Sequence, residues 1–172
     1  MTALMLHSPL GGSSAYRWLP PPYGGGCEAS PTLAQGADDP ESEHAALGTA
    51  AHALAAQCLK TSMDAWQAVG GSHHGLTVDK NMADAVQVYL NAVRKRHPDH
   101  IMAREGFHGN AWVERRFHCP EVHALFYGQA DFVYLEQEFI GTKNPAGDVL
   151  HAWDYKHGAG VIVEVQQNPQ LM

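Results

Sequence analysis

The stretches GQADFVYL (residues 128–135) and VLHAWDYK (residues 149–156) decide the expected fold. Each is a short apolar run that contains aromatic and β-branched residues, which is typical of a β-strand. The turn-forming sequence NPAG at residues 144–147 lies between them, and it favours a hairpin. We therefore expect two neighbouring strands of one sheet.

Each of these expected strands carries an acidic residue. Side chains two residues apart on a strand point to the same face, so Asp154 and Lys156 should project side by side while Tyr155 points away. Asp131 places a second carboxylate on the neighbouring strand. Two acids can hold a hard divalent cation, and a lysine beside them can orient a water molecule or offset the charge of a phosphate. Alone, an Asp-x-Lys pair is also typical of an ion pair on an exposed strand.

Further strand-like runs fill the second half of the chain, and helical patterns fill the first. The expected strands extend over residues 111–119, 122–127, 130–135, 149–155 and 160–165. Helices followed by a mainly antiparallel sheet indicate an α+β, or mixed α/β, core.

Two helices are expected before the strands. Residues 39–41 supply an N-cap acceptor, a proline at the first helical position and an acid in the first turn, so one helix should run from about residue 40 to residue 60. A second should cover residues 79–96. In the first helix, His52 should face inward with Ala45, Thr49, Ala56 and Leu59. In the second, the apolar face comprises Met82, Val86, Tyr89, Leu90 and Val93.

The composition is that of an ordinary globular protein. With 172 residues, 45% hydrophobic and 17% charged, we expect a single domain over residues 1–172 with a sizeable core. Within it, residues 1–39 should form an irregular Pro/Gly-rich arm around a short turn or helix at residues 14–19, and residues 40–172 should form the core. No apolar run approaches the roughly 18 residues that span a bilayer, and residues 1–6 lack the basic n-region and long h-region that a signal peptide would have. The default location is the cytoplasm, which is the bacterial host cytoplasm if the chain is phage-encoded.

The three cysteines, Cys27, Cys58 and Cys119, are far apart and form no C-x-x-C pair. They exclude a disulfide framework and a four-cysteine metal site within the chain, so we expect reduced thiols. Cys119 with His118 and His123 has the residue types of a zinc site, but a cysteine in a strand is more often a small core residue.

The formal net charge of -7 argues against a protein that coats nucleic acid, which is normally basic. Local clusters can still meet phosphates, and the candidates are Arg94-Lys95-Arg96, Arg104 and Arg115-Arg116. A solvated helix end and an exposed strand face explain these clusters equally well.

Five short motifs occur in a fixed order along the chain. They are GTAAH at residues 48–52, VERR at 113–116, GQAD at 128–131, DYK at 154–156 and NPQL at 168–171. In this order they resemble the RecB-like branch of the PD-(D/E)XK nuclease superfamily, and more closely its phage and prophage exonucleases. The resemblance covers nearly the whole chain, and it implies a restriction-endonuclease-like core, in which a central twisted mixed sheet is flanked by helices.

The resemblance also implies roles for individual residues. His52 matches a helix histidine that binds metal, Asp131 and Asp154 match two acidic ligands, and the carbonyl of Tyr155 matches a backbone ligand. Lys156 matches the lysine that positions or activates the attacking water.

Two further motif residues carry less defined roles in the family. Glu114 matches an acid on the first core strand and is expected as a catalytic residue or outer ligand. Gln170 matches the start of a glutamine motif that normally continues into a helix with a tyrosine four residues later, and the sequence stops at Met172 before that point.

The function implied by the resemblance is metal-dependent hydrolysis of DNA phosphodiester bonds with Mg²⁺ or Mn²⁺. The expected substrate is DNA with linear ends, and the expected setting is phage-type recombination or repair, with a phage recombination protein as partner. Two alternatives remain open: an inactive nuclease-fold module for DNA binding or assembly, and a nuclease subunit that needs a partner.

Overall fold

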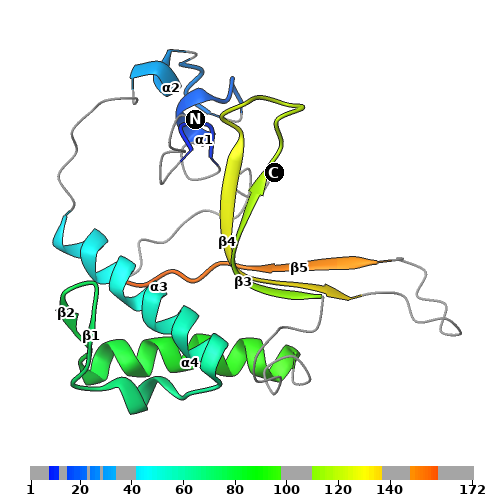
Figure 1. Ribbon diagram of the computed structural model, residues 1–172. Helices are drawn as coiled ribbons and strands as arrows, with labels where there is room; N and C mark the ends of the chain where they lie inside the picture. The colour runs from blue at the N-terminus through cyan, green and yellow to red at the C-terminus, as the bar shows by residue number, and fades with distance from the viewer. Residues whose placement is uncertain are drawn as a thin grey trace, which may run out of the picture. The chain divides into compact units, whose positions relative to one another are not determined.

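The computed structural model describes residues 8–11, 15–22, 24–27, 29–33, 42–97, 110–136 and 148–158. Helices and antiparallel hairpins are both present (Figure 1), so the expected α+β class is confirmed. The chain divides into two compact units. One contains Met1–Pro40, Arg116–Gln129 and Val161–Met172, and the other contains Glu41–Arg115 and Ala130–Gly160.

The second unit is built on two long helices, α3 (Glu43–Thr61) and α4 (Lys80–Arg96). The Asp79 carboxylate caps α4 by accepting the backbone N–H of Met82 at 2.7 Å, which confirms the predicted start of that helix. The predicted start of α3 at residues 39–41 is wrong. Its N-cap is Ser42, whose hydroxyl accepts the N–H of Ala45 at 3.2 Å and so satisfies one of the first unpaired amides. Asp39, Pro40 and Glu41 lie outside the described residues.

Helices α3 and α4 pack against each other and bury most of the core. The predicted apolar face of α4 is confirmed, since all five of its residues are buried. On α3 the prediction was only partly right, because Ala45 and Thr49 are exposed. The buried residues of α3 are Ala50, Ala51, Leu54, Ala55, Ala56, Cys58 and Leu59. Alanines occur on every side of this helix, so their spacing does not identify the buried face.

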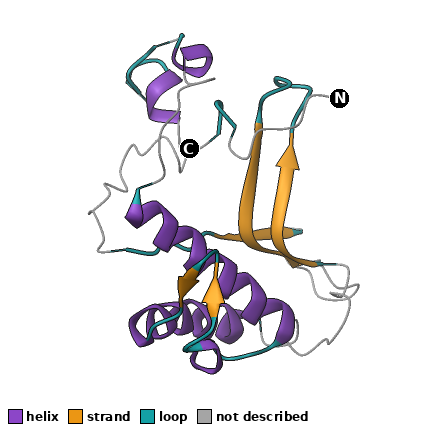
Figure 2. Ribbon diagram, turned by 60° about the vertical axis from the view of Figure 1, so that its left-hand side comes forward, coloured by secondary structure: helices purple, strands orange, loops and turns teal. Residues whose placement is uncertain are grey.

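A compact connection joins the two helices. It contains a short 3-10 helix, η2 (Ala65–Ala68), and a hairpin of β1 (Ser72–His73) and β2 (Leu76–Thr77) that lies beside α3 (Figure 2). The buried side chain of Gln87 on α4 accepts the N–H of Ala65 at 2.8 Å and donates to Asp64 at 3.1 Å. The connection is thereby tied to the helix core.

The three-stranded sheet contains β3 (Ala111–His118), β4 (Tyr127–Glu136) and β5 (Val149–Trp153) in the order β3-β4-β5. Strands β4 and β5 are antiparallel, with Phe132 opposite Trp153, which confirms the predicted pairing of these two strands. The turn predicted at residues 144–147 lies outside the described residues.

The strand predicted for residues 122–127 is wrong. Residues 119–126 form the connection between β3 and β4, in which the Cys119 carbonyl accepts the N–H groups of Val122 and His123, and the Phe126 carbonyl accepts the N–H of Cys119. The strand predicted for residues 160–165 lies outside the described residues.

The first unit contains two one-turn helices, α1 (Ala15–Trp18) and α2 (Ser30–Leu33). The short turn or helix predicted for residues 14–19 is confirmed by α1. The Ser8 hydroxyl donates a hydrogen bond to the carbonyl of Leu125, which links the start of this unit to the β3–β4 connection. In the described part of the chain, no helix combines the length and the apolar character that crossing a bilayer requires.

Candidate metal centre

Three side chains from three elements of the second unit converge on one point. His52 lies in the middle of α3, Glu114 on β3 and Asp131 on β4. One ligand atom from each lies within 4.8 Å of the other two. All three residues are partly buried, and among the described residues this is the one group of His, Cys, Asp or Glu with metal-binding spacing.

Asp131 is held on both of its oxygens. Its Oδ1 lies 3.1 Å from Nδ1 of His52, and its Oδ2 accepts the backbone N–H of Tyr155 at 2.5 Å. The hydrogen bond to Asp131 raises the pKa of His52 above its ordinary value of 6.5, although burial lowers it. The Asp131 side chain is only 13% exposed, so this ion pair is less screened than a surface pair.

Glu114 has a strained backbone. Its φ angle is 56°, in the left-handed region that non-glycine residues rarely adopt. Such a conformation costs on the order of 1–3 kcal/mol and persists only where the surrounding structure enforces it. The strain therefore coincides with the residue that brings a second carboxylate to His52 and Asp131.

An aromatic wall borders the cluster. The Tyr155 ring is buried and lies 5.4 Å from the His52 ring and 5.0 Å from the Tyr89 ring of α4. The Tyr155 hydroxyl lies 2.9 Å from Nδ1 of His157, and burial raises the pKa of Tyr155 to about 12. The phenol therefore stays neutral at ordinary pH.

Asp154 and Lys156 lie outside this cluster. Strand β5 ends at Trp153, so the triplet lies beyond the strand on which it was predicted. The two side chains still lie together while Tyr155 is buried: the Lys156 Nζ lies 2.7 Å from an Asp154 carboxylate oxygen, and the Lys156 and Asp154 side chains are 74% and 59% exposed. Lys156 nevertheless lowers the pKa of His52 electrostatically, so its ammonium acts on the cluster from the solvent side. Direct ligation by Asp154 stays a prediction.

The remaining predicted site residues either are not part of the His52, Glu114 and Asp131 cluster or lie outside the described residues. Gln170 lies outside the described residues. In the alternative zinc group, His118 Nε2 contacts the Ala124 carbonyl at 2.9 Å and His123 Nδ1 accepts the Leu125 N–H at 3.0 Å. Both rings therefore have roles in a turn.

The basic residues predicted to contact phosphates differ in whether their side chains are free to do so. Arg94 is mostly buried and donates to Asp64 at 2.5 Å and to the Met63 carbonyl, so its role is structural. Arg115 is exposed and its guanidinium lies 5.7 Å from the Trp112 ring centre, an arrangement that can meet a nucleic acid backbone. Arg104 lies outside the described residues.

The chemistry of the donor set can be compared with that of common metal ions. One imidazole nitrogen and two carboxylate oxygens suit Mn²⁺, or Mg²⁺ with water completing the shell. Ligands at about 2.1 Å from an octahedral ion are spaced about 3–4 Å apart. The 3.1 Å separation of His52 and Asp131 meets this spacing, and Glu114 has an oxygen within 4.8 Å of both ligand atoms.

The model of a family described as "Protein of unknown function (DUF2800)" matches residues 7–172. The chain belongs to the DUF2800 family. No solved structure matches the chain.

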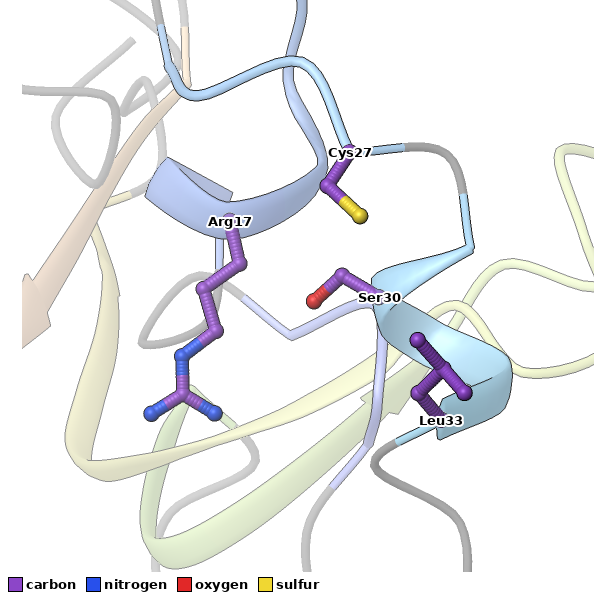
Figure 3. Close-up of a pocket in the computed structure, with 4 residues that line it drawn as sticks. All are labelled: Arg17, Cys27, Ser30 and Leu33. Atoms are coloured by element: carbon purple, nitrogen blue, oxygen red, sulfur yellow. The ribbon is translucent and has the colours of Figure 1, made fainter.

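The first unit of this DUF2800 member contains a cavity whose lining differs chemically from the acidic cluster. It has a volume of about 430 Å³, and its described lining is Arg17, Cys27, Ser30 and Leu33 (Figure 3). These side chains include one cation, one thiol and no carboxylate. The cavity therefore lacks the anionic oxygens that a hard divalent cation requires.

The pair of His52 and Asp131 gives a pH-dependent stability. Because its folded pKa is raised, the pair stabilises the fold fully below pH 6.5 and loses this contribution as the pH rises through the raised pKa. With a chelator present, we expect the difference in melting temperature between wild type and His52→Gln to be largest in mildly acidic buffer and to shrink at alkaline pH. A difference that grows with pH would contradict the charged pair.

Proposed function

We propose that this protein is a divalent-metal-dependent nuclease that hydrolyses DNA phosphodiester bonds with Mg²⁺ or Mn²⁺. The observation that carries the proposal is the convergence of His52, Glu114 and Asp131 from α3, β3 and β4 within 4.8 Å. The resemblance of the ordered motifs to RecB-like nucleases supports it, because two of these three residues are the expected ligands.

Cleavage of a phosphodiester needs a nucleophilic water, shielding of the phosphate oxygens and stabilisation of the leaving oxygen. A bound divalent cation supplies Lewis acidity and lowers the pKa of a coordinated water. His52, Glu114 and Asp131 would hold the cation, and the Tyr155 N–H fixes the orientation of Asp131. Lys156 is exposed enough to reach a phosphate or an attacking water, and Asp154 keeps it beside the cluster.

A restriction-endonuclease-like core belongs to the same proposal. The three-stranded sheet β3-β4-β5 and the helix α3, which supplies His52, support this part of the proposal. The substrate that we propose is DNA with linear ends, processed in the bacterial cytoplasm during phage-type recombination or repair, together with a phage recombination protein.

One observation favours a second candidate, a nuclease-fold module that binds DNA without cutting it. Asp154, the expected second acidic ligand, is 59% exposed and paired with Lys156. In that arrangement the charges of Asp154 and Lys156 neutralise each other at the surface, and neither residue acts on a metal ion or a phosphate.

The test is incubation of the full chain with linear DNA labelled at its 5′ or 3′ end and with circular DNA, in Mg²⁺, Mn²⁺ or EDTA. We expect metal-dependent release of label from linear DNA, a faster reaction with Mn²⁺ because of the imidazole ligand, and no reaction in EDTA. Tight DNA and Mn²⁺ binding without cleavage would favour the binding module, and cleavage in EDTA would exclude the proposed centre.

A further inference from the structure

Tyr89 of α4 carries a buried hydroxyl group that no described residue satisfies. The residue is only 8% exposed, and its hydroxyl oxygen has no hydrogen-bond partner in the described part of the chain. Leaving a buried polar group unpaired costs about 1–3 kcal/mol, and buried polar groups in folded proteins are nearly always paired. The hydroxyl therefore indicates an interaction that forms with a group bound at this place.

The surroundings of the hydroxyl identify the place. The Tyr89 ring packs at 5.0 Å on the Tyr155 ring, and the backbone N–H of Tyr155 binds Asp131. Burial raises the pKa of the Tyr89 hydroxyl, and the charges of Asp131, Glu114 and Asp154 raise it further. The phenol is therefore a neutral O–H donor within electrostatic reach of the acidic cluster.

The donor becomes useful when a cation binds. In the metal-free protein, His52 and the Tyr155 amide already occupy the two oxygens of Asp131. A cation held by His52 and Asp131 would displace the hydrogen bond that now joins them, so the carboxylate would lose one of its two donors. Carboxylates that bind metal are commonly held by hydrogen bonds from outer groups, and a hydrogen bond to a charged acceptor is stronger than one to a neutral acceptor.

We propose that Tyr89 is a positioning residue of the metal centre, whose hydroxyl donates a hydrogen bond to a carboxylate oxygen of the cluster when a cation is bound. This inference rests on the proposed function, because it requires a metal ion at His52, Glu114 and Asp131. It adds to the centre a residue from α4, which no motif of the sequence contains.

The experiment is a comparison of Tyr89→Phe with wild type by calorimetry with Mn²⁺ and by thermal unfolding with and without Mn²⁺. We expect Mn²⁺ affinity to fall about 10–100-fold, the usual loss when an outer partner of a ligand is removed. We expect the metal-free variant to unfold at the same temperature as wild type or higher, because an unpaired buried oxygen has been removed. The matched control is Tyr134→Phe on β4, which also loses one phenol oxygen and should leave Mn²⁺ affinity unchanged.

Each other outcome is decisive. Equal Mn²⁺ affinity in Tyr89→Phe and wild type would overturn the role of Tyr89 and leave the metal centre in place. A metal-free Tyr89→Phe variant that melts well below wild type would show that the hydroxyl already has a structural partner, and would also overturn it. Absence of Mn²⁺ binding by wild type would overturn both this inference and the proposed centre.

Discussion

Asp131→Asn is expected to remove Mn²⁺ binding and to reduce DNA cleavage to background. The substitution keeps the size of the side chain and an oxygen that can accept the Tyr155 N–H, but it removes the central negative charge. A unit charge pair about 4 Å apart near a protein surface is worth about 4 kcal/mol, which corresponds to about 10³-fold in affinity. Calorimetry with Mn²⁺ and single-turnover cleavage of labelled DNA measure the two effects.

The control for Asp131→Asn is Glu43→Gln in the first turn of α3, where the acid is exposed. It also removes one negative charge and should change neither measurement. Asp154→Asn is the informative companion, since direct ligation by Asp154 predicts a loss as large as that of Asp131→Asn, whereas a surface ion pair predicts a small one. If Asp131→Asn binds Mn²⁺ like wild type, the ion lies elsewhere.

Lys156→Ala is expected to slow cleavage by about 10²–10³-fold, the usual cost of losing one preorganised electrostatic contact to a transition state. Mn²⁺ affinity should stay unchanged or rise slightly, because a cation is removed from beside a cation site. Lys156→Arg should recover little, since a planar guanidinium does not reproduce a compact ammonium. Single-turnover cleavage at saturating Mn²⁺ gives the rates.

Lys80 provides a matched control for Lys156. Its Nζ lies 2.7 Å from Asp84, in an exposed ion pair like that of Lys156 with Asp154, but on the first turn of α4. Lys80→Ala should leave cleavage unchanged, and neither alanine variant should lose much stability, because water and salt screen exposed ion pairs. A near wild-type rate for Lys156→Ala would remove the chemical role of the lysine and leave cleavage to the groups held at His52, Glu114 and Asp131.

The sequence predicts those parts of the fold in which a local pattern is strong. Helix α4 has a clear apolar stripe and begins next to Asp79, and both its buried face and its extent were predicted correctly. The start and the buried face of α3 were not, because a second capping residue, Ser42, follows the Asp-Pro pair and alanines surround the helix. The apolar residues 122–127 were mistaken for a strand, since the carbonyl of Cys119 closes a turn that their composition does not reveal.

The candidate site depends on contacts between residues far apart in the chain, so local patterns cannot specify it. The motif resemblance paired His52 with Asp131, and the structure brings them together. The same resemblance gave Glu114 the role of a possible outer ligand, whereas the structure places its carboxylate within 4.8 Å of the ligand atoms of His52 and Asp131. Tyr89 was expected only as a core residue, and the single signal was a tyrosine, with its polar hydroxyl, in a stripe that otherwise holds aliphatic side chains.

The two hydrogen bonds of Asp131 also determine when the centre can assemble during synthesis. They join Asp131 to His52, 79 positions earlier, and to Tyr155, 24 positions later. Contacts of such long range form late in folding, because the intervening chain must first be ordered. A nascent chain on the ribosome therefore lacks the second hydrogen bond of Asp131 until Tyr155 has emerged, even when His52, Glu114 and Asp131 have all been synthesised.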